Sequence, residues 1–213
     1  MNAYIKKDLN MILRGGILKF AALFALIPII ALAFKDSLAI ISFLPVMNLI
    51  MIIMMIVSTI GTDLQVGFEK FAFSSPLTRY DYIFSKYLMA WVISLILATI
   101  CAIIVVALKI LPFSEIFFFV AALFSMPNII LAIMIPLFYK FGINKARFII
   151  FGVYILIMGF GGVFMSLFKD FDIFRFLIDL GQIKTSLLFI AFTMVLSLIS
   201  LMISKKILEK NEY

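Results

Sequence analysis

Long apolar runs that contain no acidic residue constrain this chain more than any other feature of it. A helix that crosses the ~30 Å hydrocarbon layer of a membrane needs about 20 such residues. Runs that reach or approach this length predict six spans, at about residues 17–34, 38–61, 87–108, 116–138, 148–168 and 185–204. Apolar and aromatic residues make up 66% of the 213 residues, more than a soluble fold could bury.

The runs are continuous rather than alternating, which favours helices over the strands of a barrel. Backbone groups inside a bilayer must be hydrogen-bonded internally, and helices do this within one segment. The predicted fold class is therefore an all-α integral membrane protein, with one transmembrane domain over residues 1–213.

The distribution of basic residues predicts the orientation of the spans. Thirteen lysines and arginines fall in the N-terminal stretch, the segments 62–86 and 139–147 and the C-terminal tail, against five in the remaining segments. Acidic residues divide six to five, so only the basic ones carry a bias. The positive-inside rule then places both termini in the cytoplasm.

Several classes of chemistry are excluded by what the chain lacks. No histidine occurs, which removes histidine-based catalysis and histidine-ligated zinc, and we predict no catalytic or metal-binding residue. The one cysteine, Cys101, lies inside an apolar run and has no partner for a disulfide. No phosphate-binding Gly-x-x-x-x-Gly-Lys-Ser/Thr motif occurs, so the chain is expected to bind no nucleotide cofactor and to be no enzyme by itself.

Charge narrows the range of functions further. The net charge of +7 is dispersed over short loops, which fits membrane topology and not a nucleic-acid partner. No Asp or Glu lies within the six runs, which argues against a carrier driven by protons or sodium ions. A transporter that has neither carboxylates in its spans nor a phosphate-binding motif needs energy from another chain.

Residues 2–14 are predicted to form an amphipathic helix that Gly15 and Gly16 end. One face carries the apolar residues Ile5, Leu9, Ile12 and Leu13. The opposite face carries Lys6, Lys7, Asn10 and Arg14. Such a helix lies in the plane of the cytoplasmic interface, either as a plain membrane anchor or in contact with a partner as well.

Outside the spans, the segment 62–86 carries the clearest signals for helices and turns. Leu64, Phe68 and Phe71 follow helical spacing, and Ser75-Pro76 should end that helix because the residue before proline disfavours helical dihedrals. Thr78, with Asp81 three residues later, resembles the start of a capped helix. The alternative is an ordinary loop with a turn.

On the external side, the apolar spacing within 169–184 predicts a short helix that Gly181 ends, or a simple lid.

Two patterns fall inside the predicted spans. Methionines recur with helical spacing along the second span, at Met47, Met51, Met54 and Met55. Met47, Met51 and Met55, with the neighbouring Asn48, are candidates for a translocation path. The alternative is that these methionines only pack or face lipid. Pro127 and Pro136 predict kinks in the fourth span.

The segment 62–86 also resembles a known family. Glu69-Lys70, an aromatic patch and the run Ser-Pro-Leu-Thr-Arg-Tyr-Asp-Tyr-Ile-x-x-Lys at 75–86 resemble the membrane subunits of type-2 ABC transporters, whose folds are like those of type V exporters. The resemblance implies a coupling helix between spans two and three that docks on a separate ATPase subunit. The residues that it implicates in this coupling are Glu69, Lys70, Phe71, Ser75, Pro76, Arg79 and Asp81.

The function that this resemblance implies is export from a bacterial cell across its plasma membrane. ATP and magnesium would bind the partner ATPase, and a second permease copy, identical or related, would complete the pathway. The small size is most similar to the subfamily that exports phenol-soluble or antimicrobial peptides, so amphipathic or apolar cargo is expected. The alternative is a membrane partner that transports nothing, such as a peptide-immunity or sensor subunit.

Overall fold

The computed structural model describes residues 2–14, 37–68, 79–167 and 181–210, and the regular secondary structure of these residues is all helical. The helices are α1 (Asn2–Arg14), α3 (Ser37–Val66), α5 (Arg79–Ala107), α6 (Phe113–Leu167) and α8 (Gln182–Lys210). The bounds of α1 are those predicted from the amphipathic spacing. The pair Gly15-Gly16, predicted to end it, lies outside the described residues.

Among the described residues, four helical segments are long and apolar enough to cross a membrane. They are Phe43–Val66, Tyr80–Ala107, Glu115–Gly142 and Gln182–Lys210. These segments match the second, third, fourth and sixth predicted spans and confirm a helical multi-pass membrane protein. The first predicted span, 17–34, lies outside the described residues, and most of the fifth falls in the second part of α6, which is not among the four. The predicted external helix at 169–184 lies mostly outside the described residues as well.

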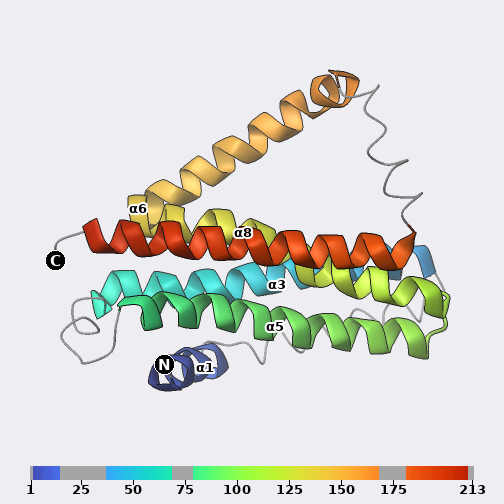
Figure 1. The fold of residues 1–213 in the computed structure, drawn as a ribbon, viewed down its shortest axis with the longest axis horizontal. Coiled ribbons are helices and arrows are strands. Elements are labelled where there is room, and N and C mark those ends of the chain that lie inside the picture. The colour runs from blue at the N-terminus through green and yellow to red at the C-terminus, as the bar shows by residue number, and fades with distance from the viewer. Residues whose placement is uncertain (1, 15–36, 69–78, 168–180, 211–213) are drawn as a thin grey trace.

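The four apolar segments lie side by side as a bundle (Figure 1). α6 packs against α3, α5 and α8, and its contact with α8 is the most extensive of the structure. α1 packs against α3 and α5 at one end of the bundle, where α3 and α8 end and α5 begins (Figure 1). This arrangement gathers α1, both ends of the connection between α3 and α5, and the last residue of α8 at the same end of the molecule.

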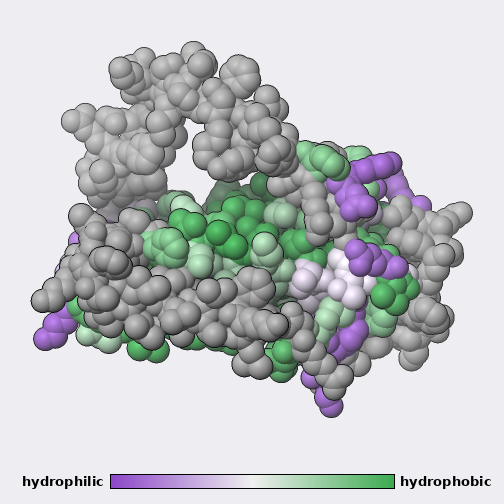
Figure 2. Space-filling view, turned by 180° about the vertical axis from the view of Figure 1, so that it is seen from behind, coloured by the Kyte–Doolittle hydropathy of each residue, from purple (hydrophilic) through white to green (hydrophobic). Residues whose placement is uncertain are grey.

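The surface of α8 is the inverse of that of a soluble amphipathic helix. Its buried positions are mostly small and polar: Thr185, Ser186, Thr193, Ser197, Ser200 and Ser204. Its exposed positions are apolar, for example Phe192, Val195 and Met202. Small residues allow helices to approach closely inside a membrane, and apolar side chains face the lipid. Figure 2, which shows the opposite face of the molecule, has hydrophobic residues across its middle and hydrophilic residues mainly toward one end.

A tight turn joins α5 to α6. Lys109 has a positive φ of 51°, and the amide of Ile110 donates to the carbonyl of Val105 at 3.1 Å. The amide of Lys109 donates to the carbonyl of Val106 at 3.0 Å, which completes the hydrogen-bond pattern of a Schellman motif. This motif satisfies carbonyls at the end of α5 and turns the chain directly into α6 at Phe113.

The break in α6 lies at Gly142 and not at either proline. Pro127 and Pro136 both lie inside the helix, whereas Gly142 has the non-helical dihedrals φ 72° and ψ 166°. Bends at the two prolines stay a prediction, because helical dihedrals are kept at both. The combination of dihedrals at Gly142 is populated essentially by glycine alone, because a Cβ atom would clash with the backbone. The second part of α6 leaves the bundle at an angle from this point (Figure 1).

Gly142→Ala is therefore expected to lower the free energy of unfolding by about 1–3 kcal/mol through backbone strain. Apart from the backbone around Gly142 itself, no described atom lies within 4 Å of a Cβ built there, so contacts with other parts of the protein add nothing to this cost. The measurement is thermal unfolding of the purified protein in detergent. Asn144→Ala, at an exposed position two residues on, is the control. Equal midpoints for the two variants would contradict the prediction.

Candidate functional site

α1 docks on the bundle through a face that only partly matches the predicted apolar one. Tyr4, Asp8 and Ile12 lie four residues apart, on one side of the helix, and are 4%, 1% and 6% exposed. Ile5, from the predicted face, packs beside this core, but Leu9 is 45% exposed. Leu13 is exposed as well. The structure thus divides the predicted face into a buried edge against α3 and α5 and an exposed apolar edge.

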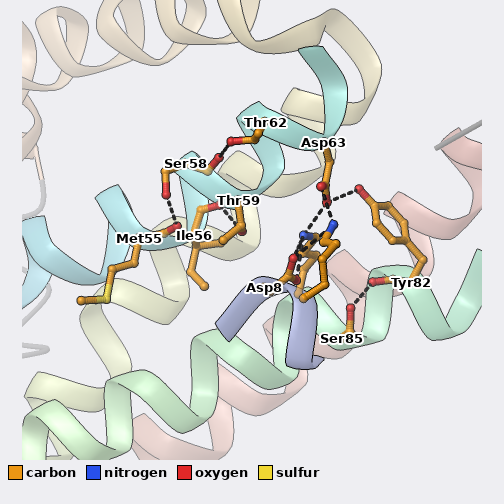
Figure 3. A network of polar contacts seen from close by, with 11 residues as sticks. Asp8, Met55, Ile56, Ser58, Thr59, Thr62, Asp63, Tyr82 and Ser85 are labelled. Atoms are coloured by element: carbon orange, nitrogen blue, oxygen red, sulfur yellow. Dashed lines mark hydrogen bonds and ion pairs between the residues drawn. The ribbon is translucent and has the colours of Figure 1, made fainter. Parts of the chain in front are cut away.

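A buried charge cluster joins α1 to α3 and α5. We define the charge cluster as Lys7 and Asp8 of α1, Asp63 of α3 and Lys86 of α5. Asp8, Asp63 and Lys86 are each 2% exposed or less. Lys86 Nζ donates to Asp8 Oδ1 at 2.9 Å, to Asp8 Oδ2 at 2.8 Å and to Asp63 Oδ2 at 2.6 Å. Figure 3 shows Asp8 and Asp63 approaching each other from α1 and α3.

Lys7 completes the charge balance from the rim of the cluster. Its side chain is 25% exposed, its Nζ donates to Asp63 Oδ1, and the same Nζ lies 3.3 Å from Asp8 Oδ1. Each carboxylate therefore contacts both ammonium groups, and the cluster holds two positive and two negative charges. A buried charge is tolerated when it is paired and hydrogen-bonded, and both conditions are met here.

Aromatic side chains enclose the cluster. Tyr82 is fully buried, and its hydroxyl donates to Asp63 Oδ2 at 3.0 Å (Figure 3). Its ring packs against Tyr4 of α1, Phe68 just after α3 and Tyr139 of α6. Lys7 Nζ lies 3.8 Å from the centroid of the Phe68 ring, a cation–π geometry. Burial among these rings places Asp8, Asp63 and Lys86 in a low-dielectric environment, which strengthens the attraction between them.

The hydroxyl groups in the last turns of α3 bond within the helix. Thr59 donates to the carbonyl of Ile56 at 2.9 Å, and Thr62 donates to that of Ser58 at 2.7 Å (Figure 3). These bonds satisfy polar side chains without drawing on the cluster. The helix then carries Asp63 to its place before Gly67, whose positive φ of 67° ends α3.

A second set of polar contacts begins at the residue after Lys86. Tyr87 Oη lies 2.6 Å from Ser200 Oγ and 3.1 Å from Ser204 Oγ of α8. Ser200 Oγ in turn donates to the carbonyl of Ala132 in α6. Lys86 and Tyr87 are adjacent in α5. Lys86 bonds to α1 and α3, and Tyr87 bonds to α8 and through Ser200 to α6, so α5 links these helices.

The connection between α3 and α5 is shorter than the predicted segment 62–86. α3 continues to Val66 and α5 begins at Arg79, so the connecting segment is 67–78. The start of α5 agrees with the predicted start at Thr78 to within one residue. Phe68 packs against the core around Tyr82, as the predicted apolar spacing requires.

Of the predicted coupling residues, the structure describes two. Arg79 is the first residue of α5, and Asp81 lies in its first turn, where a carboxylate interacts favourably with the helix dipole. The others, Glu69, Lys70, Phe71, Ser75 and Pro76, lie outside the described residues. Phe68, at one end of that stretch, lies against Lys7 of the charge cluster. At the other end, Arg79 lies three residues before Tyr82, which donates to Asp63.

The charge cluster was not predicted from the sequence. Asp63 and Lys86 lie just outside the apolar runs and counted as loop residues, whereas both lie within helices that extend past those runs. The predicted run 38–61 contains no carboxylate, whereas the longer candidate span Phe43–Val66 includes Asp63 near its end. One usable signal was Asp8, which lies between Ile5 and Ile12 on the inward side of α1.

The candidate translocation residues lie inside the bundle. Asn48 is buried, and its amide donates to the carbonyl of Leu123 in α6 at 3.0 Å. Met51 is buried, and Met47 and Met55 pack beside it against α5 and α6. Asn48 Oδ1 is buried and has no hydrogen-bond partner among the described residues. A role of these residues in a pathway stays a prediction.

Comparison with known proteins identifies a family. A family model described as ABC-2 family transporter protein matches residues 4–209, nearly the whole chain. No curated protein and no solved structure matches the chain significantly.

Proposed function

The chain belongs to the ABC-2 family of transporter proteins and is thus a permease subunit of an ABC transporter, and on that premise we propose that it forms the membrane half of an ATP-driven exporter. In this proposal a separate ATPase subunit binds ATP and magnesium and docks on the connecting segment 67–78. Both termini lie in the cytoplasm, as the excess of basic residues in the segments on that side indicates. A second permease copy completes the pathway.

The observation that carries this proposal is the place of the charge cluster at the base of the connecting segment. Lys86 bonds to Asp8 of α1 and to Asp63 of α3, so the helices on both sides of the segment are tied to each other and to α1. A force applied to the segment would therefore move α1, α3 and α5 together. Tyr87, bonded to Ser200, would pass this movement to α8.

The proposed cargo is an amphipathic or apolar peptide. The described apolar segments bury few ionisable groups apart from Asp63 and Lys86, and the charge cluster occupies these two. The methionines of α3 offer adaptable apolar contacts, which suit cargo of varied sequence. A charged, water-soluble substrate would find few partners along such a path.

Phe71→Ala tests the coupling role directly. A docking element depends on a few apolar or aromatic anchors, whose truncation often costs about 2 kcal/mol or more of binding free energy. We expect this variant to weaken capture of the ATPase at least tenfold in a pull-down and to abolish its stimulated hydrolysis. The subunit alone is expected to hydrolyse no ATP.

Phe113→Ala is the matched control, because Phe113 is 87% exposed at the start of α6, away from the connecting segment. Equal capture by both variants, with correct membrane insertion, would remove segment 67–78 from the interface. Capture of an ATPase without any peptide export in reconstituted vesicles would instead favour the immunity or sensor role.

A further inference from the structure

An open groove runs between α6 and α8, near the end of the bundle where α8 terminates. Its volume is about 680 Å³. The α6 side includes Pro136 and Lys140, and the α8 side includes Ile199, Ile203 and Lys210. Ile199 and Ile203 are 54% and 47% exposed, so this apolar surface lies open at the outside of the bundle. We call it the α6–α8 groove.

The groove is apolar along its length and positive at one end. Its polar lining residues are Ser200, Lys140 and Lys210. The Ser200 hydroxyl is already engaged by Tyr87 and by the carbonyl of Ala132, so the floor presents no free polar group. Both lysines are exposed: Lys140 lies two residues before Gly142 in α6, and Lys210 is the last residue of α8.

Within the part of the chain that the structure describes, neither lysine has an acidic partner. The nearest carboxylate in the sequence, Glu209, lies 3.7 Å from Lys205 instead. Lys140 Nζ rests 5.1 Å from the centroid of the Phe141 ring, at the mouth of the groove. The mouth therefore carries two positive charges that an anionic group could neutralise.

We propose that the α6–α8 groove binds an anionic phospholipid, with an acyl chain along Ile199 and Ile203 and the phosphate between Lys140 and Lys210. Dimensions support this occupant. From Leu196 to Ile207 the α8 wall extends about 17 Å at the helical rise per residue. One leaflet supplies about 15 Å, half of the ~30 Å hydrocarbon layer. Basic pockets between spans are known to hold anionic headgroups.

A second copy of the chain fits this groove less well. The chain carries a net charge of +7, and a symmetric copy would bring its own Lys140 and Lys210 against the same positive mouth. Like charges brought together in this way oppose association. A lipid phosphate supplies the opposite sign.

The test titrates the purified full-length protein, delipidated in detergent, with phosphatidylglycerol or with phosphatidylcholine and counts bound lipids by native mass spectrometry. Phosphatidylglycerol is expected to bind roughly tenfold more tightly than phosphatidylcholine. Lys140→Gln combined with Lys210→Gln should remove that preference. The matched control combines Lys145→Gln with Lys206→Gln, at exposed positions that do not line the groove, and should change it less than twofold.

A second arm tests the apolar part of the site. Ile203→Trp, which fills the groove, should weaken binding of both lipids at least fivefold, whereas Met202→Trp, at an exposed neighbour outside the lining, should not. Equal binding of the two lipids, or equal effects of the two lysine pairs, would overturn the proposal. Competition by water-soluble glycerophosphoglycerol or by an anionic peptide, at the same concentration as the lipid, would also overturn the proposal. A change of oligomeric mass with Ile203→Trp would overturn it as well.

Discussion

Lys86→Met is expected to lower the free energy of unfolding by about 3–5 kcal/mol, the usual cost of removing one partner from a buried ion pair. Methionine preserves the length of the side chain but leaves Asp8 and Asp63 with Lys7 as the remaining cation of the charge cluster. Two buried carboxylates would then share one ammonium group that is itself partly exposed. Lys206→Met, at an exposed position, is the control and should be close to neutral.

The measurement is thermal unfolding in detergent together with limited proteolysis of α1. Loss of the cluster should release α1 from α3 and α5, so cleavage within residues 2–14 should accelerate in Lys86→Met alone. Equal stability and equal cleavage in both variants would show that the ion pairs do not hold α1 in place.

The double variant Asp8→Asn with Lys86→Met separates charge balance from packing. It leaves Asp63 facing Lys7, so the remaining charges are equal again. We expect the double variant to be more stable than the sum of the single effects predicts, by about 0.5–3 kcal/mol. Strict additivity would mean that Asp8 and Lys86 do not interact in solution.

Tyr82→Ala is the second change with a large expected effect. The ring is fully buried and contacts the rings of Tyr4, Phe68 and Tyr139 from three other parts of the chain. Truncation of a buried aromatic residue to alanine costs about 3–5 kcal/mol, because it removes contacts and leaves a cavity. Tyr82→Phe keeps the ring and loses the hydrogen bond to the Asp63 carboxylate, at a cost of about 1.5–3 kcal/mol.

Tyr80→Ala is the matched control for this series. Tyr80 lies two residues earlier in α5, is 43% exposed and stacks on Phe84. Its truncation should cost much less than that of Tyr82 in the same unfolding measurement. If the two alanine variants unfold at the same temperature, the aromatic cluster does not support the base of the connecting segment.

These variants also separate the proposed coupling path from stability. Tyr82→Phe should destabilise the protein less than Tyr82→Ala does, so a loss of stimulated ATP hydrolysis out of proportion to its loss of stability would report on the contact between Tyr82 and the charge cluster. Phe71→Ala acts at the docking surface and should leave unfolding unchanged. If the charge cluster transmits force from the connecting segment, Tyr82→Phe should capture the ATPase normally but stimulate its ATP hydrolysis less.

Local features of the sequence determined most of the helical framework. The apolar runs predicted four helices that the structure contains, because the length of an apolar run and the need to satisfy backbone groups in lipid are local properties. The amphipathic spacing predicted α1 with its observed bounds. Such signals reside within one segment and need no knowledge of its neighbours.

The tertiary structure alone decided where the charges go and which faces are buried. Lys86 lies 78 residues from Asp8 and 23 from Asp63, so nothing local reveals that they meet. Their pairing allows α3 and α5 to continue past their apolar runs, because a paired charge can be buried and an isolated one cannot. The hydroxyl-bearing residues of α8 turn inward for a similar reason, because small and polar residues in lipid favour the interface between helices. Where that interface lies on α8 is defined only by its packed neighbours α5 and α6.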